Sequence, residues 1–344
     1  MTTEDSTDKT IRPLLDWLLE KYPDTPKKRA KQWITAGRVS VNGEIVRKPN
    51  QPITGPPITI ELLDRQATTL NCGPDGWQIH PRVNLLYLDT ALAIVNKGPG
   101  LLSVSAEPDD LSALSILADF LAGKLRARDR GIAGRSLPPA YRRLQPLPVH
   151  RLDQYTSGVF CMAMNPSARE TLIEQLSSHT MHREYVAYVE GCPRESKGTW
   201  RNWLKQSPDG LRQLVVPKLG FGGPRSVVAD VVEAITHYEL IAEFIVPGSR
   251  QAITKLRLRL ETGRKHQIRA QAAHAGLPLV GDRIYNPKYH SDAPKTHRID
   301  FPRQALHAEV LSLEHPDKPG KRMIWTAALP KDLQELEARL RDGS

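Results

Sequence analysis

Apolar residues near the start of the chain follow a helical period and then a strand period. Five of them recur at i, i+3, i+4, i+7 and i+8, the spacing of one helix face: Ile11, Leu14, Leu15, Leu18 and Leu19. Thr25 and Pro26 predict the N-cap and first residue of a second helix, which Gly37 ends. Short apolar alternations on both sides of Asn42 and Gly43 predict a hairpin, because Asn-Gly favours a tight turn. Residues 10–65 are therefore predicted to form a small α-β domain.

The pattern changes at residue 66. Residues 66–81 contain N-C-G-P-D-G and few apolar repeats, which is typical of a linker. Two apolar runs, 84–89 and 91–97, then predict strands around a turn at Asp89-Thr90. Residues 82–344 are predicted to form one larger domain.

Within this larger domain, helices and strands are segregated along the chain. An amphipathic helix is predicted after Pro166, over 166–181, and a short one after Pro330. Strands are predicted at 183–190, 226–237, 238–246, 253–261 and 305–313, with a loop at 204–224. This order favours an α+β fold with a mixed, largely antiparallel sheet.

Charge changes this picture by suggesting a polyanionic partner. The 344 residues contain 48 Lys+Arg and 38 Asp+Glu, for a net charge of +10 and a pI near 9.5. Residues 11–50 carry nine Lys or Arg residues against four Asp or Glu, half of that net charge. The alternative is a solvated charged face. The clustering on one short helix and its hairpin favours RNA backbone contact through Lys27, Lys28, Lys31 and Arg38. The Arg-, Gly- and Pro-rich segment 121–148 predicts an irregular basic surface, either along the RNA path or simply solvated.

Composition excludes several other classes of protein. Cys72, Cys161 and Cys192 lie far apart, so neither a disulfide framework nor a zinc site is expected, and Cys161 is predicted to be buried. No P-loop or dinucleotide fingerprint is present, so we expect no cofactor and no metal. The first residues do not resemble a signal peptide, and no apolar run is long enough for a membrane span. A soluble, monomeric, cytoplasmic protein is expected.

The strongest candidate chemistry lies at 149–158, V-H-R-L-D-Q-Y-T-S-G, just before the apolar run 159–164. Ionised groups at the start of a buried strand are costly unless they are paired. Asp153, with Arg151 two residues away, would stay ionised beside a cation and is a candidate nucleophile.

The segment H-R-L-D-x-x-T-S-G resembles the signature of the RluA-type pseudouridine synthases, which modify ribosomal and transfer RNA. Four more blocks resemble that family in its order: R-E-Y-V-A-Y-V at 183–189, G-R-K-H-Q-I-R-A-Q at 263–271, G-L-P-L-V-G-D-R-I-Y at 276–285 and A-L-H-A-E at 305–309. The helix, basic helix and V-x-V-N-G hairpin of the first domain resemble an S4-type RNA-binding domain. The resemblance implies a pseudouridine synthase domain over 82–344.

The resemblance also implies roles for individual residues. Asp153 would meet the cationic character that develops at the sugar carbon, much as the second carboxylate of a retaining glycosidase does. Tyr185 would stack on the target base and is a candidate proton acceptor, whereas Tyr188 should face the opposite side of its strand. Arg269 would pair with the catalytic aspartate. Arg151 would fill the space left by the flipped uridine.

Next to Gly263, Arg264 and Lys265 suit phosphate contacts, whereas His150 and Thr156 are expected to organise the loop. The reaction implied is the isomerisation of uridine to pseudouridine, in large-subunit ribosomal RNA or alternatively in transfer RNA. A glycosidase or glycosylase using Asp153 is one competing interpretation, and it needs a second catalytic carboxylate. The other is a non-catalytic RNA-binding or ribosome-assembly protein.

Overall fold

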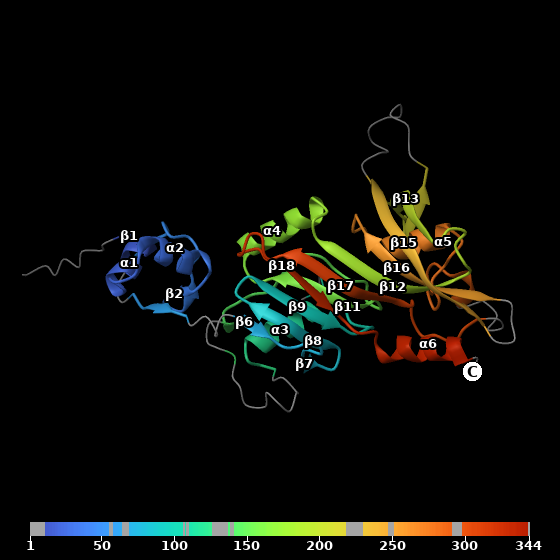
Figure 1. The fold of residues 1–344 in the computed structure, drawn as a ribbon, viewed down its shortest axis with the longest axis horizontal. Coiled ribbons are helices and arrows are strands. Elements are labelled where there is room, and N and C mark those ends of the chain that lie inside the picture. The colour runs from blue at the N-terminus through green and yellow to red at the C-terminus, as the bar shows by residue number, and fades with distance from the viewer. Residues whose placement is uncertain are drawn as a thin grey trace, which may run out of the picture.

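The computed structural model describes residues 11–54, 58–63, 69–105, 107, 110–125, 137, 141–217, 230–246, 251–290 and 298–342. Figure 1 shows a small N-terminal unit at one end of a large, strongly twisted sheet. Among the described helices, none is long and apolar enough to cross a membrane. Half of the basic segment 121–148, residues 126–136 and 138–140, lies outside the described residues.

The N-terminal unit packs two helices on short strands. Its elements are β1 (Arg12–Pro13), α1 (Leu14–Lys21), α2 (Lys27–Thr35), β2 (Val39–Val41), β3 (Glu44–Ile45), β4 (Pro52–Ile53) and β5 (Ile60–Leu62). β1 pairs with β4, and β2 lies between β3 and β5. Leu14, Leu18 and Ile34 are fully buried in its core, so the predicted helix face is the packing face.

Two details at the helix starts were predicted wrongly. Ile11 is 62% exposed and precedes the helix, because the chain first pairs as β1 with β4. The N-cap of α2 is Pro26 rather than Thr25, and no side chain caps it. The hairpin is confirmed, since Asn42 and Gly43 have φ values of 50° and 80°, the left-handed backbone that a tight hairpin turn requires.

Within the described residues, the large sheet contains thirteen strands. Their order is β14-β13-β15-β16-β12-β17-β11-β9-β8-β6, with β10, β18 and β7 paired to β11, β17 and β8. Its strands are β6 (Thr69–Asn71), β7 (Trp77–His80), β8 (Val83–Asp89), β9 (Leu92–Lys97), β10 (Leu147–Pro148), β11 (Ser157–Ala163), β12 (His182–Glu190), β13 (Lys197–Gln206), β14 (Gln213–Val216), β15 (Val231–Ile245), β16 (Ala252–Leu260), β17 (Leu306–Glu314) and β18 (Arg322–Thr326). Among these described strands, β11 and β17 form the one parallel pair. The α+β prediction with a largely antiparallel sheet is confirmed.

Three sequence predictions for this sheet were wrong. Residues 69–71 and 77–80, expected in a linker, form β6 and β7, which pair with β8. The expected loop 204–224 contains the hairpin of β13 and β14. The two strands expected over 226–246 are one strand, β15, whose register shifts between Leu240 and Ala242.

Helices cover both faces of the sheet: α3 (Ala113–Leu121), α4 (Pro166–Ser177), α5 (Gln267–His274) and α6 (Lys331–Asp342), with a short 3-10 turn η4 (Pro287–Tyr289). Side chains of β11 alternate between two cores: Phe160 and Met162 pack with α3, and Val159 and Cys161 pack with α4. α6 packs with Val186 and Tyr188 of β12, on the face of the sheet that α4 also covers. Cys161 is fully buried, as predicted.

Side chains connect the N-terminal unit to the sheet. Arg47 donates to the Thr90 carbonyl at 2.5 Å and also contacts the Asp317 carboxylate. Arg143 donates to the Asn42 carbonyl at 2.6 Å. These contacts engage the hairpin turn at Asn42 and the segment just beyond β3, at Arg47.

Candidate active site

Three central strands come into register at Ala308 of β17. Gly158 of β11 pairs with Ala308 on one side, and Tyr185 of β12 pairs with it on the other. A Cβ on Gly158 would lie 2.1 Å from the Ala308 carbonyl oxygen, so only glycine allows β17 to approach this closely. A register shift between Glu184 and Tyr185 marks a β-bulge at the same place. The loop before β11 is thereby held beside Tyr185.

Asp153 lies in that loop and is paired as predicted. Arg269 Nη1, on α5, donates to Asp153 Oδ2 at 3.1 Å. The same guanidinium donates from Nε and Nη2 to Asp282, at 2.7 and 2.8 Å. Because a bidentate carboxylate fixes the plane of the guanidinium, Arg269 offers its remaining donor to Asp153 in a set direction. The Asp153 side chain keeps 17% of its surface exposed, toward the cleft.

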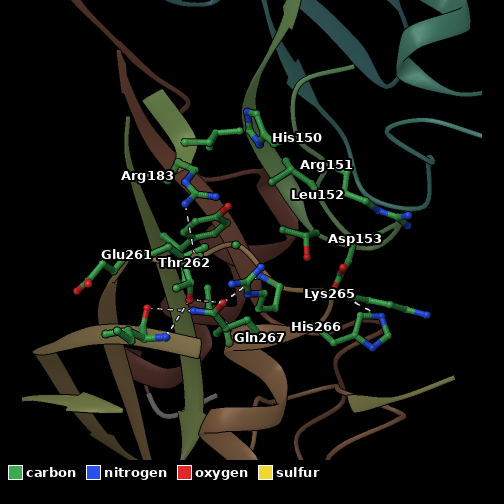
Figure 2. Close-up of a pocket in the computed structure, with 18 of the residues that line it drawn as sticks. His150, Arg151, Leu152, Asp153, Arg183, Glu261, Thr262, Lys265, His266 and Gln267 are labelled. Carbon is green, nitrogen blue, oxygen red and sulfur yellow. Dashed lines mark hydrogen bonds and ion pairs between the residues drawn. The ribbon is translucent and has the colours of Figure 1, made fainter. Parts of the chain in front are cut away.

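The cleft above Asp153 has a volume of about 620 Å³. Tyr185 and His266 line it together with Asp153 and Arg269. Figure 2 shows His150, Arg151, Leu152 and Asp153 on one side, facing the turn that carries Lys265, His266 and Gln267. The acid, the phenol and the guanidinium singled out in the sequence are therefore brought to one site.

Tyr185 and His266 are both held neutral at pH 7. Burial raises the pKa of Tyr185; the charge of Asp153 adds to this effect and that of Arg183 opposes it. Burial lowers the pKa of His266 to about 4, although Asp153 lies 3.8 Å away and favours the charged ring. His266 adopts a left-handed backbone with φ 54° at the N-cap of α5, and its Nδ1 lies 3.1 Å from the Tyr285 hydroxyl. Asp153 and Arg269 therefore carry the charge at this end of the cleft.

Two buried basic side chains hold the backbone of the Asp153 loop, and burial lowers the pKa of one of them, Lys97, to about 7. Lys97 is fully buried, and its Nζ donates to the carbonyls of Gly98, Leu101 and Gln154 at 3.1, 2.9 and 3.0 Å. Three acceptors use all three protons of an ammonium group. Arg303 Nη1 donates to the Tyr155 carbonyl at 3.0 Å. The two residues after Asp153 are therefore held by hydrogen bonds from buried Lys97 and Arg303.

Smaller contacts complete the loop as predicted. The Thr156 amide donates to the Asp153 carbonyl at 3.0 Å, and the buried Thr156 hydroxyl accepts from Gln304 at 3.3 Å. His150 Nε2 accepts from the Cys161 amide at 3.2 Å. Tyr188 faces the opposite side of β12 from Tyr185, where it hydrogen bonds to Glu337 at 2.5 Å.

The predicted RNA-contacting residues fall into two groups. Arg151, Arg264 and Lys265 are exposed and line the cleft. Lys27, Lys28 and Lys31 are exposed on α2 of the N-terminal unit, away from the cleft lining. Arg38 is half-buried and donates to the Leu63 carbonyl at 3.2 and 3.0 Å, so part of its guanidinium holds β5 in place. Within the described residues, no group of three or more His, Cys, Asp or Glu side chains is arranged to hold a metal.

Sequence reasoning missed four residues of the site. Asp282 follows Gly281 in the quoted G-L-P-L-V-G-D-R-I-Y block, and Arg183 opens the R-E-Y block, so both stood in recognisable motifs. Lys97 ends a strand that is apolar from Leu92 to Val95, and a lysine in this position indicates a paired or buried charge. Arg303 has no local pattern that reveals its contact with the loop.

Comparisons with known proteins agree with this geometry. A family model for RNA pseudouridylate synthase matches residues 91–274, and an S4 domain model matches residues 12–55. Ribosomal large subunit pseudouridine synthase D of Xylella fastidiosa is 34% identical over 335 residues, covering 95% of this chain and 88% of that protein. The protein of that name from Escherichia coli is 32% identical over 328 residues, covering 93% and 87%.

A solved structure shares the fold. Human RNA Pseudouridylate Synthase Domain Containing 4 aligns with a TM-score of 0.54 at 19% identity, over 77% of this chain and 93% of that one. The family model spans more than half of the chain, and the relatives match nearly its full length. This chain therefore belongs to the RNA pseudouridylate synthase family and carries an S4 domain ahead of its catalytic sheet.

Proposed function

We propose that this protein isomerises one or a few uridines of large-subunit ribosomal RNA to pseudouridine, with Asp153 as the nucleophile and Arg269 as its partner. The observation that carries the proposal is the 3.1 Å contact between Arg269 and Asp153 in a cleft that Tyr185 also lines. The substrate class follows the names of the relatives, which are large-subunit ribosomal enzymes. We also propose that it acts in the cytoplasm.

The isomerisation breaks the N1–C1′ bond, turns the uracil and joins C5 to C1′. The C5 proton leaves and N1 gains a proton, so the product is an isomer and the reaction is redox-neutral. The charged Asp153 stabilises the cationic character at C1′ as the glycosidic bond breaks. The neutral phenol of Tyr185 stacks on the uracil while the base turns. The buried setting of Tyr185 limits the water that can reach the detached base.

RNA binding supplies the free energy that flipping the uridine costs. Extruding a nucleotide costs a few kcal/mol, and phosphate contacts elsewhere offset this cost. We propose Arg151 as the residue that fills the vacated stack, and Arg264 and Lys265 as phosphate contacts at the rim. Lys27, Lys28, Lys31 and Arg38 extend the contact to the N-terminal unit.

A glycosidase mechanism is less well supported. It requires a second carboxylate that is free to donate a proton. Asp282, the other carboxylate bound to Arg269, is fully buried and also accepts the amides of Ile284 and Tyr285 at 2.9 and 3.1 Å. Its oxygens are therefore engaged inside the protein.

The test is to map pseudouridines in ribosomal and transfer RNA from cells with and without the gene for this protein. We expect one or a few large-subunit sites to disappear without the gene, to return with the wild-type chain, and to stay absent with Asp153→Ala. An unchanged large-subunit map would contradict the proposal, and losses confined to transfer RNA would reassign the substrate.

A further inference from the structure

Arg183 is a buried cation with almost no protein partner. Its side chain projects from β12 on the same face as Tyr185, two residues away, and the residue is only 6% exposed. Within the described residues, its guanidinium donates one long hydrogen bond, from Nη2 to the Thr262 carbonyl at 3.4 Å. Its Nε is buried and has no partner there. Figure 2 shows the guanidinium at the wall of the cleft, above Thr262.

Such an arrangement is costly for the folded protein. Removing a guanidinium from water without a counter-ion costs several kcal/mol, because neither charge nor donors are compensated. The other buried arginines near the loop are paired: Arg269 with Asp282 at 2.7 Å and Arg303 with Asp332 at 2.6 Å. In the part of the chain that the structure describes, Arg183 forms no ion pair with a carboxylate. A group kept in this state is suited to a ligand that supplies the missing charge.

The surroundings of Arg183 define where that ligand would sit. Arg183 lines the same cleft as Asp153 and Tyr185. A Cβ at Gly263 would lie 2.5 Å from Arg183 Nη1, so the missing side chain leaves room for the guanidinium against the turn. The neighbouring His150 is neutral, because burial, with a smaller effect of Arg183, lowers its pKa to about 3. A histidine carries no negative charge in either protonation state, so His150 does not compensate the charge of the guanidinium.

We propose that Arg183 binds a phosphodiester group adjacent to the flipped uridine and so fixes the nucleotide over Asp153. This inference rests on the proposed function. A phosphodiester carries one negative charge and two free oxygens, which match the fork of a guanidinium. A uracil oxygen would satisfy donors but leave the charge uncompensated, so the phosphate fits the buried cation better.

The first test measures RNA affinity and kinetics with a short RNA that contains one target uridine. Arg183→Met should raise Kd and KM about tenfold, and KM should change more than kcat. The slope of log K against log salt should become shallower by about 0.7, the value for one phosphate contact on single-stranded RNA. Arg183→Lys should restore the slope and only part of the affinity, because the charge returns without the fork. The control, Arg194→Met, alters an exposed arginine just beyond the other end of β12 and should change nothing.

The second test places a neutral methylphosphonate at each phosphate flanking the target uridine in turn. At one position, the substitution should weaken binding by the wild type about tenfold and have no further effect on Arg183→Met. The phosphate assignment is wrong if the methylphosphonate weakens RNA binding by both proteins equally at every position. If 4-thiouridine at the target then weakens binding by the wild type but not by Arg183→Met, the partner of Arg183 is the uracil.

Stability separates a binding role from a structural one. Because Arg183 has no ion pair to lose, Arg183→Met should unfold at the wild-type temperature or above it. A lower unfolding temperature together with an unchanged salt slope would overturn the inference. If the wild type forms no pseudouridine in any RNA, the proposed function itself fails. If the wild type is active and Arg183→Met binds RNA with the wild-type slope, only this inference fails.

Discussion

At the scale of single residues, one guanidinium organises the reacting carboxylate. Arg269 is 4% exposed and contacts two aspartates with different roles. Asp282 is fully buried and binds it through two oxygens, whereas Asp153 receives one hydrogen bond and faces the cleft. Asp282 therefore acts on the reaction only through Arg269.

Replacing Asp282 with asparagine should impair both stability and turnover. Breaking a buried ion pair by removing one partner costs about 3–5 kcal/mol. Without its bidentate partner Arg269 can rotate, and a misplacement of about 1 Å at a reacting group can cost about 100-fold in rate. Urea unfolding and single-turnover pseudouridine formation check the two effects.

Asp332→Asn is the matched control for that variant. Asp332 pairs with Arg303 at 2.6 Å but is 29% exposed, so its loss should cost less stability and leave turnover closer to the wild type. An Asp282→Asn protein with wild-type stability and rate would show that the inner carboxylate has no positioning role.

The sequence identified the residues that face substrate better than those that support them. Asp153, Tyr185 and Arg269 could be found because each stands in a motif whose chemistry is recognisable. Lys97 and Arg303 act on backbone carbonyls far away in sequence, at Gln154 and Tyr155. Such contacts depend on tertiary packing and leave no local spacing to detect.

At the scale of elements, the parallel pairing of β11 with β17 builds the site. Ser157 pairs with His307 in this ladder, and their side chains meet as well, with Ser157 Oγ 3.0 Å from His307 Nδ1. His307 Nε2 lies 2.9 Å from the Ala327 carbonyl, so a neutral ring donates there and accepts from Ser157. Protonation of the ring would reverse the serine bond, because Nδ1 would then donate to Ser157 Oγ.

Stability should therefore fall as the pH drops from about 6.5 to 4. Burial lowers the pKa of His307 to about 4, so below 6.5 the unfolded chain takes up a proton that the folded chain refuses. This stability is complete above pH 6.5 and is lost toward pH 4, by up to about 1.4 kcal/mol per pH unit for one proton. His150 and His266, whose pKa values are lowered to about 3 and 4, act with the same sign.

Urea unfolding of the wild type and His307→Gln at pH 7, 6 and 5 measures this contribution. The variant should show the flatter dependence on pH. Equal slopes in both proteins would show that His307 is protonated to the same extent in the folded and unfolded chains.

Long apolar strands were predictable, and short or polar ones were not. The strands β8, β9, β11 and β17 are continuous apolar runs in the sequence, as expected for buried strands. The predicted bounds of all four lie within a few residues of the observed ones. β6 and β7 contain only three and four residues, in a stretch that contains Gly and Pro. Strands this short show too little alternation of apolar and polar residues to be predicted from the sequence. The predicted break in β15, between residues 237 and 238, does not coincide with its register shift, which lies between Leu240 and Ala242.

At the scale of the whole molecule, positive charge is divided between two RNA-facing regions. The cleft carries Arg151, Arg264 and Lys265 on its lining, and α2 carries exposed lysines on the N-terminal unit. Arg47, on the same unit, is instead used to hold the Thr90 carbonyl of the catalytic sheet. We therefore expect the N-terminal unit to add affinity without taking part in the chemistry.

The triple variant Lys27→Ala, Lys28→Ala and Lys31→Ala should bind ribosomal RNA more weakly, with a salt slope shallower by about 2. That value corresponds to three lost phosphate contacts at about 0.7 each. The rate at saturating RNA should stay within a few-fold of the wild type. Filter binding over a salt series checks this, with Lys331→Ala, an 89% exposed lysine on α6, as the control. An unchanged salt slope would show that the lysines of α2 do not contact RNA phosphates.

The most direct test of the whole account is tritium release from RNA that contains uridine tritiated at C5, comparing the wild type with Asp153→Ala. Every C5–C1′ bond formed expels the C5 label, so release counts turnovers. The account predicts release by the wild type, none above background by the variant, and RNA affinity within a few-fold for both. Release by Asp153→Ala at the wild-type rate would show that the carboxylate held by Arg269 is not the reacting group.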